Sequence, residues 1–232
     1  MKIGIIGAMD HEVALLKERL EDASVREAAG MQFCSGLLGK HEAVVAKSGI
    51  GKVNAAVCAQ AMIDLLDVTH VINTGAAGSL DASIDIGDIV VSTDAVYHDV
   101  DVTNFGYAPG QVPRMEPTFP ADPVLTEAIA ASVAAVVPDI HVFRGRVLTG
   151  DQFVRTDEVK QRIRDLFGGL CCEQEGAAIA QTCRINGVPF AIVRAISDKA
   201  DGSDAMNYDE FEVMAAERSA QIVAHALEML PA

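Results

Sequence analysis

Apolar runs alternate along the chain with stretches in which apolar residues recur every three or four positions. The runs, which are rich in Val and Ile and bounded by Gly, Pro or polar residues, predict β-strands. The expected strands cover residues 2–8, 31–38, 42–47, 68–74, 89–95, 141–149 and 189–193. The periodic stretches predict helices at residues 10–21, 53–66, 121–137, 157–167, 176–183 and 208–230.

Strands and helices alternate through most of the sequence, and this order predicts an α/β protein. Gly39 and Lys40 separate two adjacent strands and form a hairpin signal, so the central sheet is expected to be mixed. No repeat, linker or low-complexity segment interrupts the 232 residues. We therefore expect a single domain over residues 1–232.

The last predicted strand carries the strongest chemical signal. Its apolar residues are followed at once by Arg194, Ser197, Asp198 and Asp201. In open α/β sheets ligands bind at the carboxyl ends of strands, and a carboxylate beside an apolar interior is suited to acid–base chemistry. A purely structural alternative stays open, in which Asp198 caps the following turn or pairs with Arg194.

Other predicted strand ends carry further candidates. Glu12 lies in the first turn of a helix that follows the first strand, although a carboxylate there also favours the helix dipole. Gly75 and Gly78, with small residues between them, leave space at another strand end. Phe153 follows a Gly turn, where an aromatic serves either the core or a ligand.

Glu173 and Glu175 precede a helix made almost entirely of small and apolar residues. A helix of that kind is buried, and carboxylates beside it are costly unless they have partners. A sugar diol would be such a partner, because it offers two hydroxyl donors to one carboxylate. The Gly-rich turn of residues 48–52 also permits close approach of a ligand, but it lacks P-loop spacing.

Composition narrows the function classes. The net charge of −15 argues against binding to nucleic acid or to an anionic membrane surface. No apolar run reaches the length of about 18 residues that a transmembrane helix needs, and the apolar start is too short for a signal peptide. We therefore expect a cytoplasmic protein that binds neither nucleic acid nor membrane.

The cysteines also favour a cytoplasmic protein, and the histidines give no sign of a metal site. The five cysteines form no C-x-x-C pair and suit a reducing compartment. The six histidines are scattered, with no spacing typical of a metal site. We expect no metal and no other cofactor.

Residues 97–113 form a long segment with aromatic residues, Gly and Pro but few charges. Long loops of this kind are usually functional or part of an interface. Little in the neighbouring sequence is available to bury Phe105, so the segment predicts an interface.

Taken in order, the motifs resemble those of the 5′-methylthioadenosine/S-adenosylhomocysteine nucleosidases, a family with the nucleoside phosphorylase fold. The resemblance runs nearly end to end, and it rests on the motifs' order and spacing, since each one alone is weak. They are IGIIGAM with Glu12, SGIGKVNAA, INTGAAG, GDIVVS, YHDVDVTNFGY, GDQFV, EQEGAAIA and VPFAIVRAISDKAD. The resemblance implies a three-layer α/β/α domain with a central mixed sheet.

The resemblance also implies the reaction, which is hydrolysis of the N-glycosidic bond of adenine nucleosides. Asp198 would be the general acid that protonates N7 of adenine. Glu12 would position and deprotonate the attacking water, with help from Arg194. Glu175 would bind the 2′- and 3′-hydroxyls of the ribose.

Further residues would bind the substrate. Phe153 would stack on adenine while the Val154 backbone binds its edge, and the 5′-substituent would be lined by Met9, Ile50, Val102 and Tyr208. Ala76, Gly78, Gln174 and Ser197 would complete the substrate site. Phe105 and Pro113 of the partner subunit would close it, which implies a homodimer.

Three positions depart from the pattern of the family. Gln174 stands where Met is usual, Ala76 where many members have Ser, and Tyr208 where Phe is common. These departures leave the reaction type unchanged, but they leave the preferred substrate open.

Other functions are open at this point. A phosphorylase of the same fold would need basic groups for phosphate, whereas the first loop offers Asp10 and Glu12, which would repel it. A related substrate such as aminodeoxyfutalosine is a second alternative. A non-catalytic adenosine sensor is a third, although binding alone would not need Glu12, Glu175 and Asp198 together.

Overall fold

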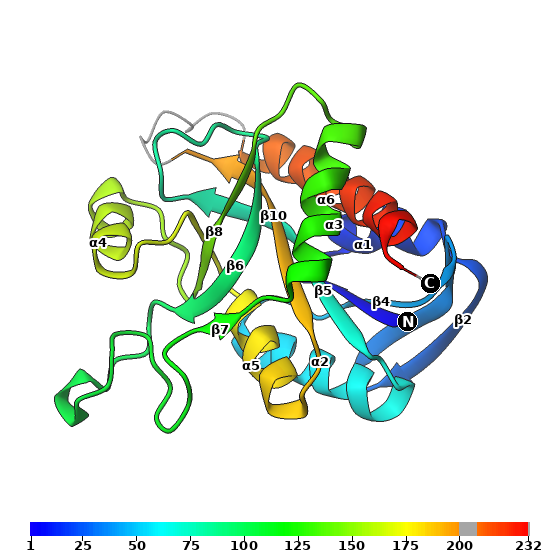
Figure 1. Ribbon diagram of the computed structural model, residues 1–232, viewed down its shortest axis with the longest axis horizontal. Coiled ribbons are helices and arrows are strands. Elements are labelled where there is room, and N and C mark those ends of the chain that lie inside the picture. The colour runs from blue at the N-terminus through cyan, green and yellow to red at the C-terminus, as the bar shows by residue number, and fades with distance from the viewer. Residues whose placement is uncertain (200–207, 232) are drawn as a thin grey trace.

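The computed structural model describes residues 1–199 and 208–231, and for residues 208–212 the course of the backbone only (Figure 1). The described strands are β1 (Lys2–Gly7), β2 (Glu21–Ala28), β3 (Met31–Leu38), β4 (His41–Lys47), β5 (His70–Ser79), β6 (Ile89–Tyr97), β7 (Phe119–Pro120), β8 (Val142–Thr149), β9 (Cys171–Glu173) and β10 (Phe190–Asp198). The helices are α1 (Asp10–Glu18), α2 (Lys52–Leu66), the 3₁₀ turn η1 (Thr103–Phe105), α3 (Pro123–Val136), α4 (Asp157–Phe167), α5 (Gly176–Asn186) and α6 (Tyr208–Met229).

The strands form one mixed sheet that closes on itself at one end. Its order is β10-β6-β8-β9-β5-β1-β4-β3-β2, and β7 adds to β6. Strand β10 pairs in parallel with β5 and antiparallel with β6, so β10, β6, β8, β9 and β5 form a ring. The remaining strands extend outward from β5 through β1, which pairs in parallel with both β5 and β4.

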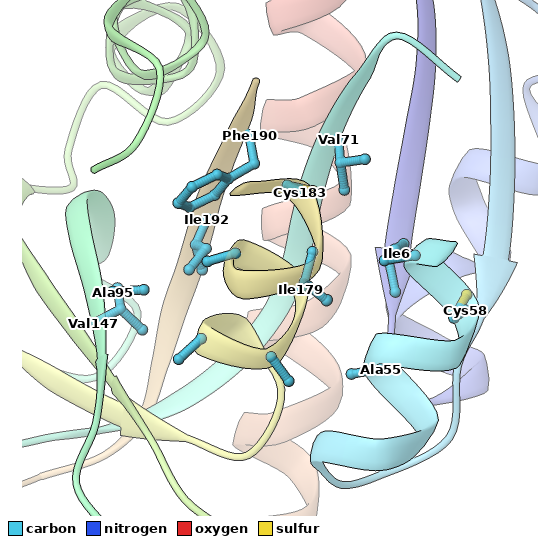
Figure 2. Packing of buried hydrophobic residues seen from close by; sticks show 14 of the residues in the cluster. Ile6, Ala55, Cys58, Val71, Ala95, Val147, Ile179, Cys183, Phe190 and Ile192 are labelled. Carbon is cyan, nitrogen blue, oxygen red and sulfur yellow. The ribbon is translucent and has the colours of Figure 1, made fainter. Parts of the chain in front are cut away.

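Helices cover both faces of the sheet. Helices α1, α3 and α6 pack together on one side, while α2 and α5 pack against each other on the other (Figure 1). An apolar core lies under each group, and Figure 2 shows the core under α2 and α5, where Ile179 lies between α5 and α2. The expected mixed α/β fold with a central mixed sheet is confirmed.

Strand β2 is the main element that the apolar pattern failed to predict. The helix predicted over residues 10–21 ends at Glu18, and β2 begins at Glu21. Almost every residue of β2 is exposed, so its sequence carries no burial signal. Backbone pairing with β3 defines this edge strand, and an apolar pattern does not report such pairing.

Strand β5 also differs from its prediction, because it continues past Thr74 to Ser79. Its small residues lie beside the end of β10, where Gly75 is opposite Arg194 and Gly78 is opposite Asp198. The small residues were interpreted as the end of the strand. In the structure they continue the strand, because the long side chains on β10 leave room only for small residues beside them.

Two further properties bear on function. Within the described residues, no helix has both the length and the apolar character needed to span a membrane. The five cysteines are free thiols, and burial raises the pKa of Cys58, Cys172 and Cys183 to about 12. These buried thiols are neutral core residues and not nucleophiles.

Two isoleucines of α5 differ in burial, so their replacement should have different effects on the free energy of unfolding. Ile179 is fully buried, whereas Ile185 is 67% exposed. Ile179→Ala should lower the free energy of unfolding by about 2–5 kcal/mol, because it leaves a cavity. Ile185→Ala should change it by no more than about 0.5 kcal/mol. Equal losses in urea denaturation would show that α5 is not packed as described.

Candidate active site

A single cavity gathers most of the predicted site residues at the carboxyl ends of β1, β5 and β10. Those that line it are Met9, Glu12, Ile50, Ala76, Gly78, Phe153, Val154, Gln174, Glu175, Ser197 and Asp198. Its other lining residues are Ala8, Ala77, Gln152, Cys172 and Glu173. The lining comes from segments spread over most of the chain, and the closed ring of strands brings them together.

Other predicted residues lie elsewhere. Arg194 is buried behind the cavity wall and does not line it. Val102, Phe105 and Pro113 lie on the segment between β6 and β7, which projects from the body of the protein (Figure 1). Tyr208 begins α6, but its side chain falls outside the described part of the chain.

Glu12 is held by backbone donors that lie just after β1 and within β5. The Ala8 N–H donates to Oε2 at 2.6 Å, and the Met9 N–H donates to the same oxygen at 3.0 Å. The Ala76 N–H donates to Oε1 at 3.1 Å. These contacts hold a buried carboxylate in one orientation, from which it can accept a further hydrogen bond or a proton.

Arg194 neutralises the acidic groups from behind. Its Nη2 donates to Asn73 and to Glu173, and it lies 3.8 Å from Oε2 of Glu175. Burial alone would lower the pKa of Arg194, but the carboxylates of Glu173, Glu175 and Glu12 outweigh burial and raise it. The guanidinium therefore stays charged and holds the glutamates together.

Glycine at position 75 makes this arrangement possible. A Cβ atom there would lie 2.2 Å from Oε1 of Glu12 and 2.3 Å from Nη1 of Arg194. Both distances are far shorter than a van der Waals contact. Gly75 therefore allows β5 to pass directly beside the two charged groups.

Glu173 and Glu175 differ in their partners. The backbone N–H groups of Glu175 and Gly176 donate to Oε2 of Glu173, at 3.0 and 2.7 Å, and Thr149 donates to its Oε1. Glu175 accepts a hydrogen bond from the Gly51 N–H at 2.9 Å. Burial, followed by the neighbouring Glu173, raises the pKa of Glu175 to about 7, against the lowering effect of Arg194.

Asp198 is the last residue of β10. Lys160 of α4 donates to its Oδ2 at 2.6 Å, and the Ser197 hydroxyl donates to Oδ1 at 3.3 Å. A Cβ atom on Gly78 would lie 2.9 Å from Oδ1, so this glycine leaves room for the carboxylate. Asp198 is thus an accessible acid with a cation beside it.

Sequence reasoning assigned no site role to Glu173 or Lys160. Glu173 was recognised as a costly carboxylate, but nothing in the sequence showed that it would meet Arg194. One feature of the sequence could have indicated that Lys160 is buried: it shares the inward-facing side of α4 with Ile163 and Phe167. A lysine in an apolar stripe is a candidate for a buried ion pair.

Comparisons with known proteins identify the family of the chain. Residues 2–228 match the family model of the phosphorylase superfamily. A 5′-methylthioadenosine/S-adenosylhomocysteine nucleosidase of Bacillus cereus (strain G9842) is 43% identical over 231 residues, which cover 99% of this chain and 100% of the relative. The chain belongs to this nucleosidase family.

Solved structures place the chain in the same family. The nucleosidase from Neisseria meningitidis in complex with methylthio-immucillin-A superposes with a TM-score of 0.94 at 40% identity, covering 99% of both chains. The futalosine hydrolase of Helicobacter pylori strain 26695 superposes with a TM-score of 0.91 at 32% identity, covering 99% of this chain and 98% of that one. Nucleosidase family membership therefore rests on likeness in sequence and in fold over almost the whole chain.

The raised pKa of Glu175 predicts how stability depends on pH in this nucleosidase family member. Its folded-state pKa of about 7 lies above the ordinary 4.5, so its stabilising contribution is complete below about pH 4.5 and is lost as pH rises through 7. The stability of Glu175→Gln relative to wild type should therefore rise by about 2–3 kcal/mol between about pH 5 and pH 8.

Chemical denaturation of both proteins across this pH range provides the measurement. Glu18→Gln, which changes an exposed glutamate of α1, is the matched control and should follow wild type at every pH. A constant difference between Glu175→Gln and wild type would contradict the raised pKa.

Proposed function

We propose that this protein hydrolyses the N-glycosidic bond of 5′-methylthioadenosine and S-adenosylhomocysteine, and of 5′-deoxyadenosine, releasing adenine. The carrying observation is that one cavity is lined by Glu12, Glu173, Glu175 and Asp198 but, among the described residues, by no Lys or Arg. Acid–base groups for a neutral nucleoside and water are therefore present without a cradle for an anion. Such a reaction would serve methionine salvage and the recycling of by-products of S-adenosylmethionine.

Departure of adenine needs a proton on the base. Glycoside cleavage passes through an oxocarbenium-like state, and an acid that protonates the leaving group lowers its barrier. Asp198 is the proposed acid, acting on N7 of adenine so that the base leaves as a neutral molecule. Phe153, which is 60% exposed at the cavity, would stack on the ring, and the Val154 backbone would bind its edge.

Attack by water needs a base at the other reacting centre. Glu12 is the proposed base, supported by its backbone donors, which orient the carboxylate without providing a proton of their own. Arg194 would act here through the charge network behind the wall, since it does not line the cavity. Ala76, which presents its backbone N–H to Glu12, carries no hydroxyl for the water.

Binding of the ribose would fall to Glu175 with Gln174 beside it. The 2′- and 3′-hydroxyls would donate two hydrogen bonds to the Glu175 carboxylate, favouring its charged form at neutral pH. Met9 and Ile50 would contact the 5′-substituent, together with Val102 and Tyr208. Gly78 and Ser197 would complete the wall beside Asp198.

Hydrolysis is favoured over phosphorolysis by charge. A phosphate dianion in the cavity would lie among four carboxylate side chains without a lining Lys or Arg from the described residues. Arg194 and Lys160, two cations behind the cavity wall, are already paired with Glu173 and Asp198. Water has no charge to be repelled by this lining.

Substrate choice within this chemistry has one specific alternative. The futalosine hydrolase of Helicobacter pylori shares the fold at 32% identity, so aminodeoxyfutalosine belongs in the substrate panel. The nucleosidase relatives are more similar to this chain, which favours 5′-methylthioadenosine and S-adenosylhomocysteine. Adenine release from purified protein, with and without phosphate, separates hydrolase, phosphorylase and sensor.

The proposed assembly is a symmetric homodimer in the cytoplasm. Phe105 is 76% exposed on the projecting segment, and Val53 and Val57 of α2 are 74% and 41% exposed, one helical turn apart. Apolar groups with this exposure support an interface between two copies, in which Phe105 and Pro113 would reach the neighbour's cavity. Five free cysteines support a reducing compartment.

The proposed acid is tested by Asp198→Asn. This change keeps the shape of the side chain but removes its ability to deliver a proton, so kcat for adenine release from 5′-methylthioadenosine should fall at least about 100-fold. The control is Asp165→Asn, which changes an exposed carboxylate of α4 and should leave kcat unchanged. Near wild-type turnover by a folded Asp198→Asn variant would refute the acid.

The proposed dimer is tested through Phe105. Light scattering should give twice the mass of one chain, and Phe105→Ala should raise KM for 5′-methylthioadenosine more than it lowers kcat, because the residue would cover the 5′-group and not the reacting bond. Phe143→Ala, a partly buried phenylalanine of β8, controls for the loss of a ring elsewhere. An active monomer at the assay concentration would contradict the shared cavity.

A further inference from the structure

Lys160 occupies a place that its residue type does not ordinarily take. It lies on α4, whose inward-facing residues are Lys160, Ile163 and Phe167, at the spacing of an apolar stripe. Only 4% of the residue is exposed. Lysine is almost never buried to this degree unless it is paired, so the structure must supply a partner for its charge.

Asp198 is that partner. The ammonium Nζ lies 2.6 Å from Oδ2 of Asp198, and it also donates to the backbone carbonyl of Lys199. The lysine side chain is 5% exposed and the aspartate side chain 21% exposed. The cation therefore approaches the carboxylate from the protein side, while Asp198 also lines the cavity.

The other groups around Asp198 leave Lys160 as its dominant charged neighbour among the described residues. From β9, Cys171 and Cys172 are buried thiols whose pKa burial raises far enough to keep them neutral, and Glu173 is paired with Arg194. Strand β5 contributes Gly78, which has no charge. Lys199 directs its ammonium to Asp85 at 2.6 Å.

We propose that Lys160 is a positioning residue for the acid: its ammonium holds Asp198 at the cavity wall and stabilises the carboxylate that remains after proton transfer. When Asp198 protonates N7, its O–H bond breaks and an N–H bond forms on the base. The electron pair of the broken bond stays on the carboxylate, next to Lys160. This inference rests on the proposed function, because it needs Asp198 to be the acid.

The contact acts on the acid and not on the affinity for the nucleoside, because Lys160 does not line the cavity. Removal of the ammonium should therefore lower kcat while KM stays close to its wild-type value. A lysine that only anchored α4 to β10 would change stability without lowering kcat.

The experiment measures kcat and KM for adenine release from 5′-methylthioadenosine by wild type, Lys160→Met and Lys160→Gln. In both neutral variants kcat should fall about tenfold, because part of the acid's contribution is lost, while KM should change no more than about twofold. Lys160→Arg keeps the charge and should retain the wild-type kcat.

Two matched controls isolate the contact. Arg164→Met removes one positive charge and one ion pair, with Asp81, from the same helix, and its kcat should stay that of wild type. In the Asp198→Asn background, Lys160→Met should cause no further loss of kcat. An equal loss of kcat in Arg164→Met, or an additive loss in the double variant, would overturn the proposal.

Failures of the two proposals are distinguishable. A wild-type protein that releases no adenine refutes the proposed function itself. Active wild type with an unchanged kcat in folded Lys160→Met and Lys160→Gln refutes only the role of Lys160. Loss of the folded circular-dichroism signal in both neutral variants, but not in Lys160→Arg, would show that the ion pair serves the fold, and would also overturn it.

Discussion

The buried guanidinium of Arg194 is the charge on which the rest of the site depends. A group of this kind is expensive to remove from water, and it stays buried only when nearby carboxylates compensate it. Glu173 supplies the direct ion pair, and Glu12 and Glu175 add their charges. The same guanidinium allows three glutamates to lie near one another, so the positions of the acids and of the cation are mutually dependent.

Sheet closure makes that meeting of charges possible. Because β10 pairs at Arg194 with both β5 and β6, this part of the strand is enclosed, and the Arg194 side chain is buried instead of reaching solvent. Close pairing then requires small residues opposite the charged ones. Gly75 and Gly78 meet this requirement, since a side chain at either position would collide with Glu12, Arg194 or Asp198.

Charge in the site is arranged in two layers. The carboxylates line the cavity, while Arg194 and Lys160 stand behind them and are nearly excluded from solvent. Cations in the second layer stabilise the acids without offering a binding site to an anionic substrate. A neutral nucleoside and a water molecule suit such a cavity, and each acid is held in place by a different set of partners.

Local patterns in the sequence predicted much of the fold and many of the site residues. Apolar runs and helical spacing predicted most strands and helices, and the order of motifs around Glu12, Glu175 and Asp198 indicated the family, because burial and turn chemistry act on neighbouring residues. The exposed strand β2 was missed, since it is defined by pairing with β3 and not by burial.

Only the tertiary structure decided which charges meet. Nothing local links Arg194 to Glu173, or Lys160 to Asp198, because each pair joins residues on different elements whose approach depends on how the sheet closes. The sequence shows which charged side chains are present, but it does not show the distances between them. Electrostatic interactions depend on those distances and on burial, which the folded arrangement alone determines.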